Sequence, residues 1–223
     1  PDRIEIVPPG VDHDLFAPGD RGAARAALGL DAAGPLLLFV GRIQPLKGLD
    51  VAVRALAALD RDDARLAVVG GPSGADGPAE LRRVRAIVDG LGLAGRVRFV
   101  APQPHARLAA WYRAADVCLV PSRSESFGLV ALEAAACGTP VVAAAVGGLR
   151  TLVDHGHTGF LVEGRDPAAY AAYAGEIVGN PVLAGEMAVS AAARSGRYRW
   201  SMTAARLRRL YADLTARSLV ECR

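Results

Sequence analysis

Two glutamates and two basic residues have the chemical types and spacing needed to bind a phosphorylated sugar. Glu125 lies in the polar stretch Pro121–Gly128, and Glu133 follows it with seven residues in between. Carboxylates accept hydrogen bonds from hydroxyl groups, as an acidic residue does for ribose in dinucleotide-binding folds. Arg42 and Lys47 flank a short loop, and together they could hold a diphosphate. The alternative is that all four are solvated surface charges.

The two glutamates follow a predicted strand and lie at the start of a predicted helix. The apolar run Val117–Val120 is typical of a buried strand. A helix is expected from about Gly128 to Cys137, closed by Gly138 and Pro140. Free backbone N–H groups and the positive end of a helix dipole suit a phosphate group. The pattern therefore predicts phosphate on main-chain amides and sugar hydroxyls on the carboxylates, as a nucleotide-sugar requires.

Short apolar runs alternate with helical stretches along most of the chain. This alternation predicts an α/β fold, a Rossmann-like parallel sheet with helices on both faces. Strands are expected at Ile4–Val7, Leu36–Val40, Leu66–Val69, Val97–Val100, Val117–Val120, Val141–Ala145 and Phe160–Val162. Helices are expected at Arg21–Leu30, about Leu49–Leu59, Ala79–Leu91, Ala106–Ala115, Gly128–Cys137, Pro167–Val178, Pro181–Arg194 and Ser201–Ser218.

Ligands of open parallel sheets bind at the carboxyl ends of the strands. The segments that follow the predicted strands are Gly41–Gly48, Gly70–Gly74, Pro102–Gln103, Ser122–Gly128 and Val146–Gly148. They bring glycines, two cations and two acids to one edge, where we expect a single ligand-binding rim. Neither glycine-rich loop contains G-x-G-x-x-G or G-x-x-x-x-G-K-[ST], which disfavours hydride transfer and nucleoside triphosphate hydrolysis.

Composition narrows the function classes further. The 223 residues carry a formal net charge of +3 with an isoelectric point near 9.0, and only 5% are aromatic. A mild basic balance without stacking rings gives poor support for a nucleic-acid surface and suits an anionic small substrate better. Hydrophobic residues make up 52%, enough for a sizeable core in one domain.

The cysteines, histidines and serines show no pattern of a metal site, disulfide frame or catalytic triad. Cys118, Cys137 and Cys222 are widely spaced and lack C-x-x-C, as is typical of reduced thiols in an intracellular protein. No histidine has metal-ligand spacing, and Ser124 and Ser126 lack a nearby base. The longest apolar stretch is too interrupted to span a membrane. We therefore expect a cytoplasmic protein without a metal site.

The last predicted helix, from Ser201 to about Ser218, is amphipathic and basic. Its apolar residues recur at helical spacing, which favours docking on a protein face over binding to a membrane surface. Trp200 and Tyr211 are expected to be packing anchors rather than stacking platforms.

Several motifs resemble those of the GT4 family of retaining glycosyltransferases, which have the GT-B architecture. The most specific is the E-x7-E pattern of Glu125–Glu133. The others are Gly41-Arg42 with Lys47-Gly48, Val7–Asp12 with Phe16, and Cys137–Val142. The resemblance extends from about Ile4 to Tyr211. One turn departs from it, because Gly-Gly-Leu is followed by Arg150 where the family usually has proline.

The resemblance implies the C-terminal, donor-binding half of a GT-B enzyme. Residues 1–223 would form one nucleotide-sugar donor-binding domain, with an interdomain hinge at about 1–18 and a final helix, at about 201–218, that crosses to the missing N-terminal acceptor domain. The chain begins at Pro1 rather than Met, and we expect a fragment of a longer protein. A UDP-sugar is the implied substrate, and no cofactor or metal is required for catalysis.

The resemblance also implies roles for individual residues. Arg42 and Lys47 would bind the donor diphosphate and stabilise the leaving UDP, and Glu125 would lie near the donor sugar, so these three are the predicted catalytic residues. Glu133 would bind the ribose hydroxyls, and Gln103 would lie near the uracil. The other expected donor-binding residues are Gly41 and, through backbone amides, Ser126, Phe127, Gly128 and Leu129.

The implied reaction moves a sugar, GlcNAc from UDP-GlcNAc, to an inositol phosphate or similar acceptor, as in mycothiol biosynthesis. The fragment alone is expected to bind UDP but to turn over little. Three alternatives stay open: a non-catalytic nucleotide-sugar-binding or assembly module, a GT4 enzyme with another donor, and a GT-B epimerase or phosphorylase. No nucleic-acid partner or membrane span is expected, and a homo-oligomer is left open.

Overall fold

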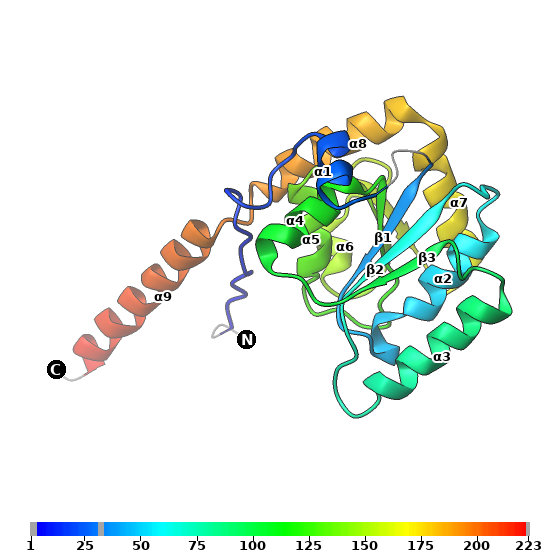
Figure 1. Cartoon of the computed structure of the whole chain (residues 1–223). Coiled ribbons are helices and arrows are strands. Elements are labelled where there is room, and N and C mark those ends of the chain that lie inside the picture. Colours follow the sequence, from blue (N-terminus) through cyan, green and yellow to red (C-terminus); the bar gives the residue numbers. More distant parts are fainter. Residues whose placement is uncertain (1–3, 31–33, 222–223) are drawn as a thin grey trace.

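The computed structural model describes residues 4–30 and 34–221, and its centre is a six-stranded parallel sheet (Figure 1). The strands are β1 (Leu36–Val40), β2 (Arg65–Val69), β3 (Val97–Val100), β4 (Val117–Val120), β5 (Val141–Ala144) and β6 (Gly159–Val162). They lie in the order β3-β2-β1-β4-β5-β6, and every neighbouring pair is parallel. The predicted Rossmann-like α/β fold is confirmed.

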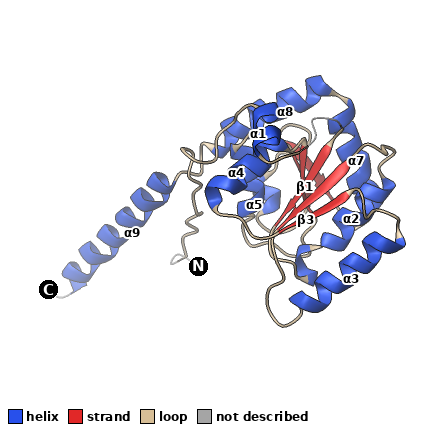
Figure 2. Cartoon of the chain, viewed as in Figure 1, coloured by secondary structure: helices blue, strands red, loops and turns tan. Residues whose placement is uncertain are grey.

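Helices cover both faces of the sheet (Figure 2). The helices of the described residues are α1 (Arg21–Ala27), α2 (Leu49–Ala58), α3 (Gly77–Gly90), α4 (His105–Ala114), α5 (Leu129–Ala136), α6 (Leu149–Leu152), α7 (Pro167–Gly179), α8 (Pro181–Ser195) and α9 (Trp200–Glu221), with a 3-10 turn η1 (Pro45–Lys47), and α9 takes no part in covering the sheet (Figure 1). Predicted and observed helix ends agree to within about three residues, the scatter expected where the last turn of a helix frays.

The sheet is buried on both faces because successive residues of its strands point to opposite sides. In β1, Leu38 joins the core cluster formed with α1, α4 and α5, while Leu37 and Phe39 join the cluster formed with α2, α3 and α7. Cys118 and Cys137 are free thiols in the first cluster. Cys222 lies outside the described residues.

The direction of strand addition reverses between β1 and β4. The chain adds β2 and then β3 on one side of β1, and returns to add β4, β5 and β6 on the other. The connections that leave the carboxyl ends of β1 and β4 lead to helices on opposite faces of the sheet, α2 and α5, and this switch point is where open parallel sheets leave a crevice for a ligand.

The prediction of an opening strand at Ile4–Val7 is wrong. These residues have no regular secondary structure, and the side chains of Ile4 and Ile6 are 84% and 80% exposed. A strand needs a partner for its backbone N–H and C=O groups. Among the described residues, the first hydrogen bond between two backbone groups comes later, where the Val11 amide donates to the carbonyl of Tyr198 at 2.9 Å.

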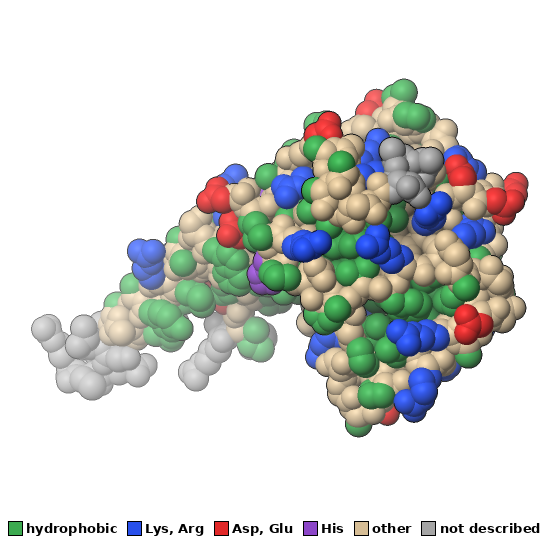
Figure 3. Space-filling view, viewed as in Figure 1, with side chains coloured by type: hydrophobic (Ala, Val, Ile, Leu, Met, Phe, Trp, Pro, Cys, Tyr) green, Lys and Arg blue, Asp and Glu red, His purple; other side chains and the backbone are tan. Residues whose placement is uncertain are grey.

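Helix α9 forms as predicted, but its apolar face is uncovered. It projects from the sheet domain (Figure 1), and hydrophobic side chains lie along it (Figure 3). Trp200 is 55% exposed and Tyr211 is 63% exposed, so the prediction that both are packing anchors is wrong for this structure. The segment before α1 lies against the start of α9, where the Thr203 hydroxyl donates to the Pro8 carbonyl at 2.9 Å.

Among the described residues, no helix combines the length and the apolar character needed to cross a membrane.

Candidate functional site

The loops after β1 and β4 touch at the switch point. The loop after β1 contains η1 (Pro45–Lys47) and ends at Gly48, whose φ is +71°. A Cβ on Gly48 would lie 2.1 Å from the carbonyl oxygen of Pro121, so only glycine permits this approach. The amide of Arg123 also donates to the carbonyl of Leu46 at 2.8 Å. The two loops therefore form one continuous surface.

Lys47 and Glu125 form an ion pair across this contact. The Lys47 Nζ lies 2.6 Å from the Glu125 Oε2, and the two side chains are only 20% and 17% exposed. The hydroxyl of Ser122 donates weakly to the same oxygen at 3.4 Å. The sequence placed Lys47 and Glu125 on a common rim, and the structure brings them into direct contact.

Two glycines after β5 support the loop that carries Glu125. The Gly148 amide donates to the Glu125 carbonyl at 3.0 Å. Gly147 has a φ of +45°, and a Cβ there would lie 1.9 Å from that same carbonyl oxygen. Both glycines belong to the rim that the sequence predicts, but the sequence indicates no function for them. Their role is to let the β5 loop pack directly against the main chain of Glu125.

Four of the predicted donor-binding residues lie together where α5 begins. The helix starts at Leu129 directly after Gly128, and no side chain caps its first amides. Ser126 and Leu129 are exposed, whereas Phe127 is half-buried and meets the ring of Tyr198 edge-on at 5.6 Å. Uncapped amides at a helix N-terminus are available to an external acceptor.

Glu133 lies in the second turn of α5, turned towards α4. Its Oε2 accepts a hydrogen bond of 2.7 Å from the hydroxyl of Tyr112. Burial raises the pKa of the Glu133 carboxyl above its ordinary value, while the Tyr112 hydrogen bond and the nearby charge of His105 act in the opposite direction. Glu133 is thus a largely buried acid with a specific donor, and not a solvated surface charge.

The remaining predicted site residues, Arg42, Gly41 and Gln103, follow the strands β1 and β3. The Arg42 side chain is exposed and has no hydrogen bond or ion pair with any described residue. Gly41 continues the β1–β2 ladder, since its amide donates to the Val69 carbonyl at 3.0 Å. Gln103 follows the edge strand β3, and its Nε2 donates to the Ala101 carbonyl at 2.8 Å. The structure thus leaves Arg42 available and turns the Gln103 amide towards its own loop.

Sequence reasoning missed the residues that support the site from neighbouring helices and loops. Tyr112 contacts Glu133 from α4. Arg165 donates to the Pro121 carbonyl at 3.3 Å and pairs with Asp50 at 3.3 Å. These contacts join residues 21, 44 and 115 positions apart. A tyrosine or arginine in a helical or loop pattern carries no local signal of such a partner.

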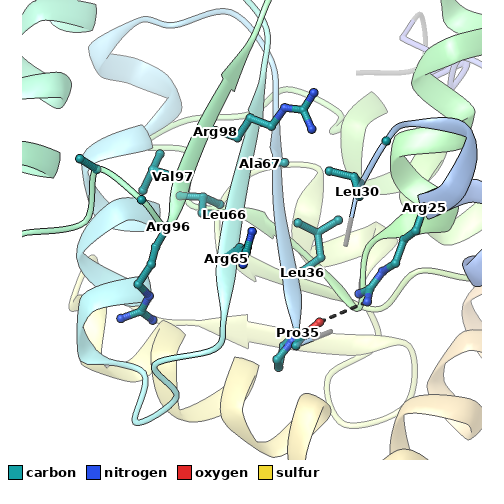
Figure 4. Close-up of a pocket in the computed structure, with 14 residues that line it drawn as sticks. Arg25, Leu30, Pro35, Leu36, Arg65, Leu66, Ala67, Arg96, Val97 and Arg98 are labelled. Carbon is teal, nitrogen blue, oxygen red and sulfur yellow. Dashed lines mark hydrogen bonds between the residues drawn. The ribbon is translucent and has the colours of Figure 1, made fainter. Parts of the chain in front are cut away.

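The opposite edge of the sheet has a separate cavity of about 300 Å³ among the amino ends of β1, β2 and β3 (Figure 4). Arginines line it, but Figure 4 shows Arg96 and Arg98 pointing in different directions. Arg25 is already engaged, since it pairs with Asp116 at 2.6 Å and donates to the Gly34 carbonyl. Because these guanidinium groups do not converge, the rim at the carboxyl edge is the better candidate site.

Within the described part of the chain, no three His, Cys, Asp or Glu side chains lie close enough together to hold a metal ion.

The fold and the rim define a class of protein, a Rossmann-like α/β domain with its polar site at the switch point. Residues 20–194 match the family described as glycosyl transferases group 1, and the chain belongs to this family. The resemblance seen in the sequence motifs is confirmed.

The similar proteins are longer than this chain. D-inositol 3-phosphate glycosyltransferase of Acidothermus cellulolyticus is 50% identical over 222 residues, which cover 97% of this chain and 49% of that protein. Sucrose-phosphate synthase of Thermosynechococcus elongatus superposes with a TM-score of 0.89 at 39% identity, covering 95% of this chain and 53% of that one. Anabaena Alr3699/HepE, solved in complex with UDP-glucose, superposes with a TM-score of 0.87 at 25% identity, covering 94% and 57%.

Two facts follow from these comparisons. The chain spans about half the length of the curated relatives it matches. The sequence motifs resemble those of D-inositol 3-phosphate glycosyltransferase (MshA), and the relatives confirm this resemblance.

Proposed function

We propose that this chain is the donor-binding domain of a retaining glycosyltransferase that uses a UDP-sugar. The observation that carries the proposal is the contact of Lys47 with Glu125 at the switch point, beside the uncapped start of α5. One rim thus offers cations and main-chain amides for a diphosphate and carboxylates for sugar hydroxyls. Membership of the glycosyl transferases group 1 family supports the same function.

Arg42 and Lys47 act on the diphosphate in this proposal. Arg42 is exposed with a free guanidinium fork, and Lys47 provides a compact ammonium group on the facing side of the loop. When the glycosidic bond to the sugar breaks, negative charge develops on the β-phosphate. Cations already in place stabilise this charge in the transition state and lower the barrier. The leaving UDP therefore needs no metal ion from the protein.

The carboxylates act on the sugars. Glu133 accepts hydrogen bonds from the ribose hydroxyls, and Glu125 lies beside the donor sugar. The amides of Ser126 to Leu129 bind the phosphate and the donor sugar, Gly41 lets the donor approach the end of β1, and Gln103 lies near the uracil. The Gln103 Nε2 donates to the Ala101 carbonyl, which leaves the amide oxygen as the acceptor for the base.

The proposed donor is UDP-GlcNAc, and the proposed acceptor is an inositol phosphate or a similar molecule, in a step of mycothiol biosynthesis. The support is the identity of 50% with D-inositol 3-phosphate glycosyltransferase and the UDP-glucose complex of the Anabaena neighbour. The acceptor would be bound by an N-terminal domain that precedes this chain.

The uncovered face of α9 supports the domain assignment. We assign residues 1–223 to one donor domain, residues about 1–18 to the hinge and α9 to the crossing towards the N-terminal domain, in a cytoplasmic enzyme. Exposed apolar side chains along α9 are expected where a second domain docks. The hinge segment already contacts this helix, since Arg206 pairs with Glu5 at 2.6 Å.

The test is isothermal titration calorimetry of the 223-residue chain with UDP, UDP-GlcNAc and, as a base control, ADP. We expect binding of both uridine nucleotides and weaker binding of ADP. Arg42→Ala should weaken UDP binding by about tenfold or more, as expected for loss of a charged phosphate contact. Arg82→Ala, which removes an exposed arginine of α3, should leave it unchanged. A folded chain that binds no UDP contradicts the proposal.

A non-catalytic assembly module would use the same uncovered face of α9. The two functions are separated by adding the N-terminal half of the full-length protein. Sugar transfer from UDP-GlcNAc that depends on Lys47 supports the enzyme, and complex formation without transfer supports the module.

A further inference from the structure

The most specific buried polar contact near the rim joins Tyr112 of α4 to Glu133 of α5. The Tyr112 side chain is fully buried, and its hydroxyl donates to the Glu133 Oε2 at 2.7 Å. The ring is fixed by an edge-on contact with Phe16, with centroids 6.0 Å apart. A buried phenol with one fixed partner is a directed hydrogen-bond donor.

This contact divides the two oxygens of the Glu133 carboxylate between separate roles. Burial keeps the pKa of the Tyr112 phenol well above its usual value, so the hydroxyl keeps its proton and always donates. Oε2 is therefore held in place as an acceptor. No hydrogen bond from a described residue reaches Oε1, which stays available to accept a hydrogen bond from a ligand.

A second contact fixes Tyr112 relative to α5. The buried hydroxyl of Thr139, just beyond the end of α5, donates to the Tyr112 carbonyl at 2.7 Å. Helices α4 and α5 are thus joined through Tyr112 twice, once by its side chain and once by its main chain. The position of the Glu133 carboxylate is determined by the packing of both helices, not by α5 alone.

We propose that Tyr112 is a positioning residue that orients the Glu133 carboxylate for the ribose hydroxyls of a bound nucleoside diphosphate. The proposal rests on the proposed function and adds to it a residue that does not touch the ligand. Tyr112 acts through Glu133, so its effect should appear only for nucleotides whose ribose hydroxyls are present.

The experiment measures the affinities of UDP and 2′,3′-dideoxy-UDP for the 223-residue chain by calorimetry. In Tyr112→Phe, the Kd of UDP should rise by about tenfold, because Glu133 is no longer held in place and the hydrogen bonds from the ribose hydroxyls to its charged carboxylate are weakened. The Kd of the dideoxy nucleotide should change by less than about twofold, since it has no hydroxyl for Glu133 to bind. An equal loss for both nucleotides, or no loss for UDP, overturns the proposal.

The matched control is Thr139→Val, which removes the other buried hydrogen bond of Tyr112 but leaves its hydroxyl in place. We expect a lower melting temperature with an unchanged ratio of the two affinities. If the ratio of the UDP affinity to the dideoxy-UDP affinity falls as much as in Tyr112→Phe, the effect is one of general packing, and the specific role of the hydroxyl is overturned.

The double variant Tyr112→Phe/Glu133→Ala covers the case in which Tyr112→Phe does not fold. It removes donor and acceptor together, so no buried carboxylate is left unpaired. Its UDP affinity should equal that of Glu133→Ala, and a further loss of threefold or more overturns the proposal. If the unmodified chain binds no UDP, the proposed function itself fails. UDP binding with an unchanged affinity ratio in Tyr112→Phe overturns only the role of Tyr112.

Discussion

Replacing Glu125 by glutamine should strengthen the binding of UDP, although Glu125 is a predicted catalytic residue. Lys47 is paired with Glu125 at 2.6 Å. A diphosphate must share Lys47 with this carboxylate and approach its negative charge. Glutamine is similar in shape and still accepts a hydrogen bond from Lys47, but it carries no charge. The substitution therefore removes the repulsion and keeps the packing.

The size of the effect follows from the geometry. A phosphate oxygen bound to the Lys47 Nζ lies about 2.8 Å from it. With the Glu125 oxygen at 2.6 Å on another side of the same nitrogen, the two oxygens are about 5 Å apart. Two unit charges at this separation repel by about 3 kcal/mol at an effective dielectric constant near 20. Both side chains keep about a fifth of their surface in solvent, so roughly half of this remains, which is about tenfold in Kd.

The assay is calorimetric titration of Glu125→Gln with UDP and UDP-GlcNAc at fixed ionic strength. We expect tighter UDP binding but a smaller gain for UDP-GlcNAc, because the contact of Glu125 with the donor sugar is weakened. Asp63→Asn removes the same kind of charge from an exposed pair with Arg61 at 2.8 Å, before the amino end of β2, and should change neither affinity. UDP binding that is threefold weaker in a folded Glu125→Gln variant would refute the competition and show that Glu125 orders Lys47 for the phosphate.

Two other substitutions test the cost of building the site. Burial raises the pKa of Glu133 in the folded chain, so the fold loses stability as the pH rises through that value. Glu133→Gln should therefore melt at a higher temperature than the unmodified chain at neutral pH. This difference in melting temperature should vanish near pH 4.5, the ordinary pKa of the group. A lower melting temperature of the variant at neutral pH contradicts the reasoning. Gly147→Ala should lower both the melting temperature and UDP affinity, because its Cβ would lie 1.9 Å from the Glu125 carbonyl. Gly29→Ala, at a φ of +62° with no atom within 4 Å of the new Cβ, should cost only the backbone strain of about 1–2 kcal/mol and leave UDP affinity unchanged. Equal losses of melting temperature and of UDP affinity in the two glycine variants would rule out the steric explanation.

The sheet could be predicted from the sequence because its signal is local. Leu36–Val40, Val97–Val100 and Val117–Val120 were predicted to the residue, since a short apolar run between turn signals has few other buried conformations. Ile4–Val7 has a similar composition but no neighbouring strand, so its backbone stays unpaired. Apolar periodicity likewise predicted α9. It showed which residues share a face but not whether anything covers that face.

The candidate site could be predicted as a set of residues but not as a set of contacts. The topology of a parallel sheet brings the segments after each strand to one edge, which was enough to select Arg42, Lys47 and Glu125. The ion pair of Lys47 with Glu125 joins positions 78 residues apart, and it depends on the close approach that Gly48 permits. The role of Tyr112 has no signal in the sequence, because nothing in its own segment distinguishes it from an ordinary core aromatic.

The Lys47–Glu125 pair also constrains how the site changes when a donor binds. An uncompensated lysine in a largely buried position would be costly, and Glu125 removes that cost. The diphosphate has to share Lys47 with this carboxylate, so the gain on binding is smaller than the full value of one ion pair. The other oxygen of Glu125 can accept a hydrogen bond at the position where the proposed donor sugar lies. UDP alone offers no hydroxyl there, and on this reasoning the rim should favour the complete donor over UDP alone.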